Sequence, residues 1–170
     1  MVGLNRSTRA LALAAIVMAA TAGAASAQLA VTASVNPALT VSSPSGLDFG
    51  AVTKPSVTTV AFNAANTGIL QVAGASNADI LVTFPLTVTF NGPGTAPVYA
   101  ILASSVGTKV ISTGTCDRTG LASVDVTTGT LNPNLGAGGI LCYTVGGRLT
   151  TTASTSSGAF SGTLTIVVSY

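Results

Sequence analysis

Apolar and polar residues alternate along most of this chain with a period of two, the pattern of β-strands that are buried on one face. The alternation comes in short runs, and clusters of Gly, Pro, Asn and Ser interrupt it about every ten residues. No window beyond residue 27 has a convincing helical period. Strands are therefore predicted at residues 39–41, 47–50, 58–63, 68–74, 80–84, 86–90, 98–104, 108–112, 121–127, 140–145 and 162–170.

Short strands with turns at this spacing are typical of a β-sandwich. We expect an all-β fold over residues 37–170, with the architecture of an immunoglobulin-like sandwich. Pro85 separates two of the predicted strands and indicates a break, because proline cannot donate a hydrogen bond to a ladder.

The last run is the most regular. Leu164, Ile166, Val168 and Tyr170 alternate with Thr, Val and Ser residues, so a strand would place all four on one side. We interpret them as the core-facing side of the terminal strand.

Residues 1–27 have the features of a signal peptide that is removed on export. Arg6 and Arg9 precede an apolar run that is too short to span a bilayer, and Ala25-Ser26-Ala27 fits a small-x-small cleavage site. The mature chain would begin at Gln28, and no later apolar stretch is long enough for a transmembrane helix. We expect export through the inner membrane to the periplasm and then the cell surface or the medium, with no membrane span.

Residues 28–36 form a separate predicted element at the mature N-terminus. Leu29, Val31, Ala33 and Val35 alternate with small or polar residues, and Asn36-Pro37 separates this run from the rest. An apolar stripe on a terminal strand has to dock on a sheet edge, either in its own domain or in a neighbouring subunit. The pattern leaves both outcomes open.

Charge excludes several functions. Without Arg6 and Arg9, four of the six basic residues remain against four Asp, so the mature chain has a net charge of zero. Four scattered cations cannot form the basic face of a nucleic-acid-binding protein. The sequence has no His and no Glu, so the usual general bases and clustered carboxylate ligands are missing. We expect no enzymatic activity, no metal and no cofactor.

The chain has two cysteines, Cys116 and Cys142, both in the mature part. In an oxidising compartment the simplest interpretation is one structural disulfide. A redox or metal pair would need a CxxC spacing or nearby His, and neither is present.

Three stretches resemble a known family. They are "VTASVNPALTVSSPSGLDFGAV" (residues 31–52), "LQVAGASNADILVTFP" (residues 70–85) and "YTVGGRLTTTASTSSGAFSGTLTIVVSY" (residues 143–170). The last contains a VGG-x-L motif at residues 145–149 and a G-x-[YF]-S-G turn at residues 158–162. In order and spacing these resemble the bacterial domain-of-unknown-function family 4402, and the two ends are similar to the spore coat protein U family and the archaic chaperone–usher pilins.

This resemblance implies a structural subunit of a surface fibre or pilus-like fimbrium. In such subunits an incomplete immunoglobulin-like sandwich is completed by a strand from a neighbour, so the implied partners are identical or related subunits, a periplasmic chaperone and an outer-membrane usher. The chain departs from those pilins at Ser42, where they often carry a cysteine. The alternative is a self-complete secreted or surface domain that acts as an adhesin or matrix protein.

We predict a disulfide between Cys116 and Cys142 in the exported protein. Closing a loop of this length stabilises the fold by about 3 kcal/mol in the chain-entropy model. Intact-mass measurement after alkylation without reduction should find no modified thiol; two alkylated cysteines in the native protein would contradict the prediction.

Overall fold

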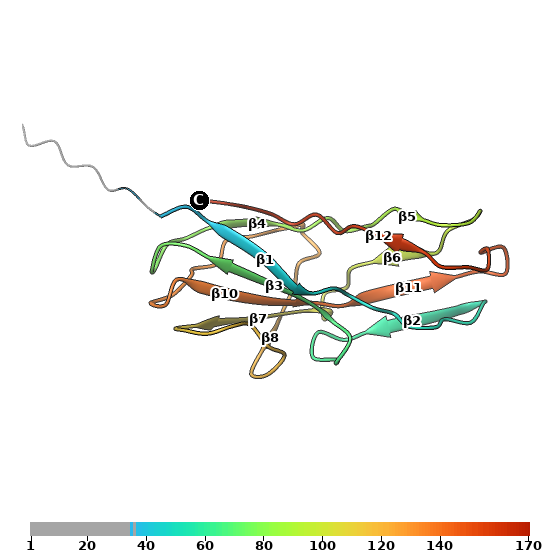
Figure 1. Ribbon diagram of the computed structural model, residues 1–170, viewed down its shortest axis with the longest axis horizontal. Helices are drawn as coiled ribbons and strands as arrows, with labels where there is room; N and C mark the ends of the chain where they lie inside the picture. The colour runs from blue at the N-terminus through green and yellow to red at the C-terminus, as the bar shows by residue number, and fades with distance from the viewer. Residues whose placement is uncertain (1–34, 36) are drawn as a thin grey trace, which may run out of the picture. The chain divides into compact units, whose positions relative to one another are not determined.

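The structure is a computed structural model that describes Val35 and residues 37–170. Val35–Tyr170 forms one compact unit, and it is all-β: its described residues contain strands and turns but no helix (Figure 1). None of them forms a helix long and apolar enough to cross a membrane. The all-β antiparallel sandwich expected from the alternation is confirmed.

The largest sheet has five antiparallel strands. β3 (Gly68–Ala73) and β10 (Ile140–Val145) lie at its centre, with β10 paired residue by residue to β3 on one side and to β7 on the other. The order across the sheet is β1 (Thr40–Ser45), β3, β10, β7 (Val106–Ile111) and β8 (Ala122–Val124).

Three smaller sheets complete the sandwich. Their strand orders are β2 (Ser56–Val60), β11 (Gly147–Thr151), β6 (Val98–Ala100); β13 (Val167–Ser169), β4 (Leu81–Thr83), β9 (Thr130–Leu131); and β12 (Ser161–Gly162), β5 (Phe90–Asn91). Both strands of the C-terminal segment thus pair with residues 81–91: β12 pairs with β5, and β13 pairs with β4.

The core lies between the five-stranded sheet and the sheet that contains β4. Alternate residues of β10 such as Leu141 and Tyr143 point inward and are buried, and Val82 and Phe84 meet them from the opposite layer. The rings of Phe84 and Tyr143 pack edge to face, with centroids 5.3 Å apart. The period of two therefore places one apolar face of each sheet in a shared core.

β10 and β11 are almost one continuous strand that changes sheets at Gly146-Gly147. A Cβ at Gly146 would lie 2.1 Å from the Val60 carbonyl oxygen, and one at Gly147 would lie 2.4 Å from the Tyr99 ring. Gly147 also has φ +154, a backbone conformation that glycine adopts readily. The Tyr99 hydroxyl donates a hydrogen bond to the Gly146 carbonyl (2.8 Å). This bond fixes the backbone where the chain passes from β10 into β11.

Two predicted strands are wrong. Residues 47–50 are not in a strand, because β1 ends at Ser45 and the following chain has no ladder partner. Of residues 86–90, only Phe90 belongs to a strand, since Pro85 ends the pairing of β4 and the chain resumes pairing only at β5. Both irregular stretches lie beside the candidate site.

Replacing Gly147 by Ala should destabilise the domain by about 2–5 kcal/mol, because the methyl group meets Tyr99 and the backbone conformation is strained. Gly120→Ala is the matched control, since Gly120 also has positive φ but has open space around it. Thermal unfolding of both variants checks this; equal losses would show that the Tyr99 contact contributes nothing.

Candidate functional site

The C-terminal segment presents its predicted apolar side to the core, but it is not the single strand predicted for residues 162–170. β12 ends at Gly162 and β13 begins at Val167, so residues 163–166 lie outside any strand. Leu164, Ile166 and Val168 all pack against the main core cluster, and the residues between them are exposed. These three side chains are nevertheless only half-buried, so the described residues leave one side of the segment without cover.

Tyr170, the fourth residue predicted to face the core, does not lie in it. Its side chain is 48% exposed, because the strand ends at Ser169 and the tyrosine reaches over the rim of the domain. Its hydroxyl donates to the Pro37 carbonyl (2.7 Å) and accepts from the Ala75 amide (2.9 Å). Tyr170 thus joins the C-terminus to the start of β1.

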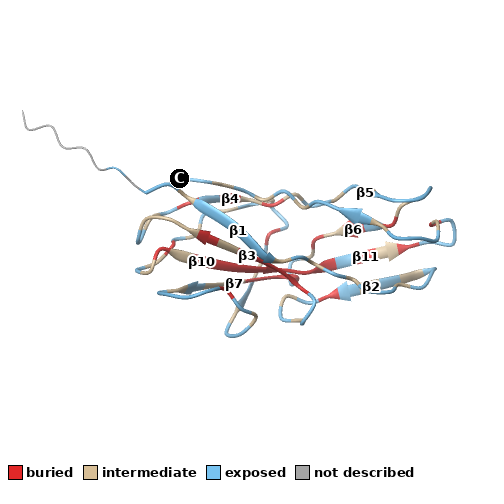
Figure 2. Cartoon of the chain, viewed as in Figure 1, coloured by how far each residue is buried: buried red, intermediate tan, exposed pale blue. Residues whose placement is uncertain are grey.

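The described residues leave β1 without cover as well. Its first five residues are exposed on both faces, including Val41 at 47%, whereas the neighbouring β3 is buried along most of its length (Figure 2). An edge strand whose inner face packs on a core would alternate between buried and exposed residues. β1 and the C-terminal segment therefore border a part of the sandwich that the described residues leave incomplete.

A groove of about 1250 Å³ opens at this place. One wall, here called the first wall, consists of residues 43–54, which are the end of β1 and the chain that follows it. The second wall consists of residues 155–166, the chain that leads into and past β12. In Figure 1 these are the blue-green stretch after β1 and the red stretch around β12.

The groove is lined mainly by apolar side chains that belong to the edge of the core. Leu70, Val145 and Leu149 are buried behind it, and side chains from both walls are half-buried: Leu47, Phe49, Val52, Leu164 and Ile166. The only charged lining residues, Asp48 and Lys54, are both engaged. Asp48 accepts from the Gly50 amide (2.8 Å), and Lys54 donates to the Thr155 carbonyl (2.5 Å).

Within the described part of the chain, main-chain groups along both walls lack ladder partners. There β1 pairs only with β3, β12 only with β5, and β13 with β4. Among the described residues, neither Leu164 nor Thr165 takes part in a ladder or in a main-chain hydrogen bond. Two unpaired edges beside an apolar groove can accept an additional extended strand.

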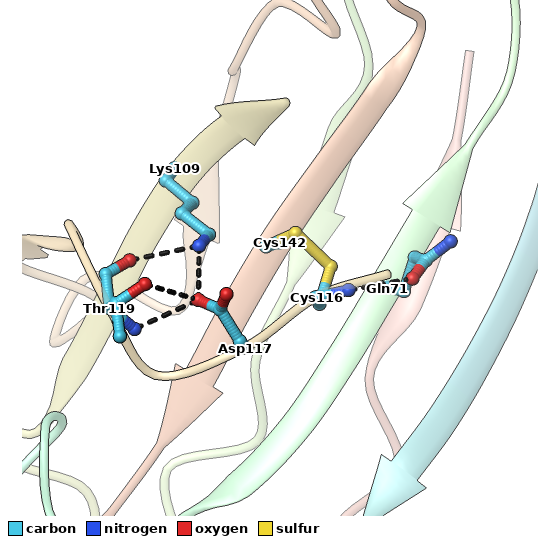
Figure 3. The surroundings of a disulfide bond; sticks show 6 residues. All are labelled: Gln71, Lys109, Cys116, Asp117, Thr119 and Cys142. Atoms are coloured by element: carbon cyan, nitrogen blue, oxygen red, sulfur yellow. Dashed lines mark hydrogen bonds and ion pairs between the residues drawn. A yellow bond between two sulfur atoms is a disulfide. The ribbon is translucent and has the colours of Figure 1, made fainter. Parts of the chain in front are cut away.

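The disulfide predicted from the sequence joins Cys116 to Cys142. It lies away from the main core, because Cys142 points to the outer face of β10, where it packs with Ile69 and Ile111. Residues 112–120, here called the strap, are bound to this outer face: Cys116 also donates its amide to Gln71 (3.1 Å) (Figure 3).

Asp117 fastens the strap to β7. Its carboxylate pairs with Lys109 and accepts hydrogen bonds from the amide and hydroxyl of Thr119 (Figure 3). The hydrogen bond from Lys109, followed by those from Thr119, lowers the pKa of Asp117 to about 2. This carboxylate therefore stays ionised through the ordinary pH range and keeps the strap bound to β7.

The remaining aspartates have local roles. Asp48 and Asp125 each accept a hydrogen bond from the amide two residues later, the pattern of Asx turns, and Asp79 accepts from Asn134. Within the described residues no cluster of three or more His, Cys, Asp or Glu side chains is close enough to hold a metal ion.

The predicted donor residues Leu29, Val31 and Ala33 lie outside the described residues. Val35 is described and is 91% exposed. The sequence predicted that this strand would dock somewhere, but not where a receiving groove would lie. A signal for the first wall was present in residues 47–52, which carry the three large apolar residues Leu47, Phe49 and Val52.

Comparison of the chain with protein-family models, curated proteins and solved structures finds no match. The resemblance to family 4402 and to the pilins therefore stays a prediction, and the groove has to be interpreted from its own chemistry.

Ile166→Asp should destabilise the domain by about 1–3 kcal/mol and reduce soluble yield, because it places a carboxylate without a partner against the core. Thr165→Asp is the matched control: it adds the same charge one position away, on an exposed residue. Denaturant unfolding and soluble expression check the pair. Equal tolerance of both substitutions would contradict the register of this strand.

Proposed function

We propose that the protein is a structural subunit of a bacterial surface fibre and that its groove accepts residues 29–35 of a neighbouring copy. The observation that carries the proposal is the apolar groove of about 1250 Å³ between two strand edges that have no partner among residues 37–170. A groove of this kind offers both of the interactions that define strand addition: main-chain hydrogen bonds and pockets for alternate side chains.

The proposed donor is long enough to lie along the apolar part of the second wall. A seven-residue strand spans about 23 Å, and residues 161–166 span about 20 Å when extended. Residues 29–35 can therefore extend past both Leu164 and Ile166.

The donor also matches the groove in chemistry. Residues 28–35 carry no charged side chain, and the two charged residues of the groove already have partners within the domain. Leu29, Val31 and Val35 share one side of the strand, and burying each of these side chains is worth about 1.5–3 kcal/mol. The alternation thus suits a site with one apolar floor and one open side.

The start of β1 favours exchange over self-insertion. To enter its own groove, the donor would have to reverse direction between Val35 and Thr40. Tyr170 holds the Pro37 carbonyl, and Leu39 packs against the core, so both residues needed for such a turn are already engaged. Figure 1 shows the described chain entering β1 from the end of the domain where the C-terminus lies.

An open groove also requires protection before assembly. An exposed apolar edge would associate unspecifically, so a periplasmic chaperone that lends a strand, and an usher that exchanges it for a donor, are the partners that fit this function. The proposed location is the periplasm during export and the cell surface afterwards.

The second candidate is a self-complete surface domain, in which residues 29–35 fill the groove of their own chain. It requires release of Pro37 from Tyr170, and it gives a monomer. The size of the mature protein in solution and the effect of deleting residues 28–35 distinguish the two candidates.

Deleting residues 28–35 should prevent polymerisation and leave a domain that binds an added peptide of the sequence QLAVTASV. In the full mature chain, Val31→Asp should abolish polymers, because the charge enters the apolar groove, and Thr32→Asp on the outward side should not. Light scattering and electron microscopy measure assembly, and fluorescence anisotropy measures peptide binding. A mature chain that stays monomeric at high concentration, together with a deletion that only unfolds it, would contradict the proposal.

A further inference from the structure

Arg118 connects the strap to the first wall of the groove. Its Nε donates to the Thr67 hydroxyl (3.0 Å), and one terminal nitrogen donates both to the Thr67 carbonyl (2.7 Å) and to the Ser45 hydroxyl (2.9 Å). Thr67 is completely buried, and Ser45 lines the groove. Arg118 is half-buried, and these three contacts are to neutral oxygens.

These contacts lie where the ladder of β1 is weakest. The register between β1 and β3 shifts between Ser42 and Ser45, and Pro44 has no amide hydrogen to donate. Only the Ser43 hydroxyl, which donates to the Ile69 carbonyl (3.2 Å), adds a side-chain bond to β3 inside the irregular stretch. Without Arg118, the end of β1 would therefore be loosely held.

The chain that follows this point forms the first wall. The Gly68 position approaches closely to the Leu47 main chain, and Asp48 exchanges hydrogen bonds with Asn66 through its amide (3.0 Å) and its carbonyl (2.6 Å). Arg118 on one side and Asn66 on the other thus fix the stretch that places Leu47 in the groove. The disulfide in turn fixes Arg118, which lies two residues after Cys116.

We propose that Arg118 is a positioning residue for strand acceptance, and that the Cys116–Cys142 disulfide shapes the groove by holding Arg118 against Ser45 and Thr67. This inference rests on the proposed function of the groove. It adds that oxidation of the two cysteines controls strand acceptance, because only the oxidised subunit presents a first wall that is fixed in place. The disulfide then acts on assembly as well as on the stability of the fold.

Arg118→Lys tests the proposal in the full mature chain, kept dilute enough to be monomeric by light scattering. Lysine keeps the charge but cannot bond Ser45 and both Thr67 oxygens from one planar group. Affinity for fluorescent QLAVTASV should fall about tenfold, and exchange of the Asp48 amide should accelerate about tenfold, the effect of losing one hydrogen bond from a charged donor. Amides of β10 should keep their exchange rates.

Asp117→Asn is the matched control, because the neighbouring residue fastens the same strap to β7 rather than to the wall. It should change neither the peptide affinity nor the Asp48 exchange. The Cys116→Ser/Cys142→Ser variant should reproduce the effect of Arg118→Lys, and adding Arg118→Lys to it should cost little more, since the two changes remove the same contact.

Unchanged Asp48 exchange in Arg118→Lys, an equal effect in Asp117→Asn, or additive losses in the triple variant would each overturn the proposal. If the unmodified chain binds no peptide, the proposed strand acceptance fails instead. The amide exchange then still decides whether Arg118 holds the first wall.

Discussion

Apolar side chains beside an unpaired strand edge are the constraint on which this structure depends. Water can satisfy the free main-chain groups of such an edge, but it cannot favourably cover Leu47, Phe49, Leu164 and Ile166. Exposed apolar side chains and unpaired strand edges occur together at one place in the described sandwich, between the chain after β1 and the C-terminal segment. An extended segment with an apolar side satisfies both at once, and the sequence has one at its mature N-terminus.

The rest of the domain fixes the residues that surround the groove. The central strands β3 and β10 are fully paired and contribute Leu70 and Val145 to the back of the groove, and β11 contributes Leu149. On the outer face the strap fastens the end of β1 through Arg118, where Pro44 and the register shift weaken the ladder. At the opposite end Tyr170 holds the Pro37 carbonyl. β1, which leads into the first wall, is thus held at both of its ends from outside the groove, and the interior of the groove is free for a partner.

The sequence predicted the regular parts of this fold well. The alternation in residues 68–74 and 140–145 identified the central strands, because these strands bury one face against a core and the other against local cover. The disulfide followed from the presence of two cysteines in a chain expected to enter an oxidising compartment. Residues 47–50 and 86–90 were predicted as strands because their apolar spacing is the same, but their partners are missing or interrupted by proline.

The candidate site could be predicted only in part. The donor pattern and the inward side of the terminal strand are local, so a period of two reveals them. The groove itself is made by residues far apart in the chain, and Arg118 reaches Ser45 and Thr67 across more than fifty positions, which no local pattern records. Tyr170 was assigned to the core by its place in the alternation, whereas the end of the strand places it on the rim.

Photo-crosslinking in isotope-mixed assemblies tests strand exchange most directly. Benzoylphenylalanine is placed at Val31 in unlabelled mature chains, which are assembled with an equal amount of ¹⁵N-labelled chains and irradiated. The account predicts cross-links from position 31 to peptides that contain Leu47 or Ile166, with partners of both isotopes. Cross-links confined to single-isotope chains, or directed to peptides outside the groove, would contradict it.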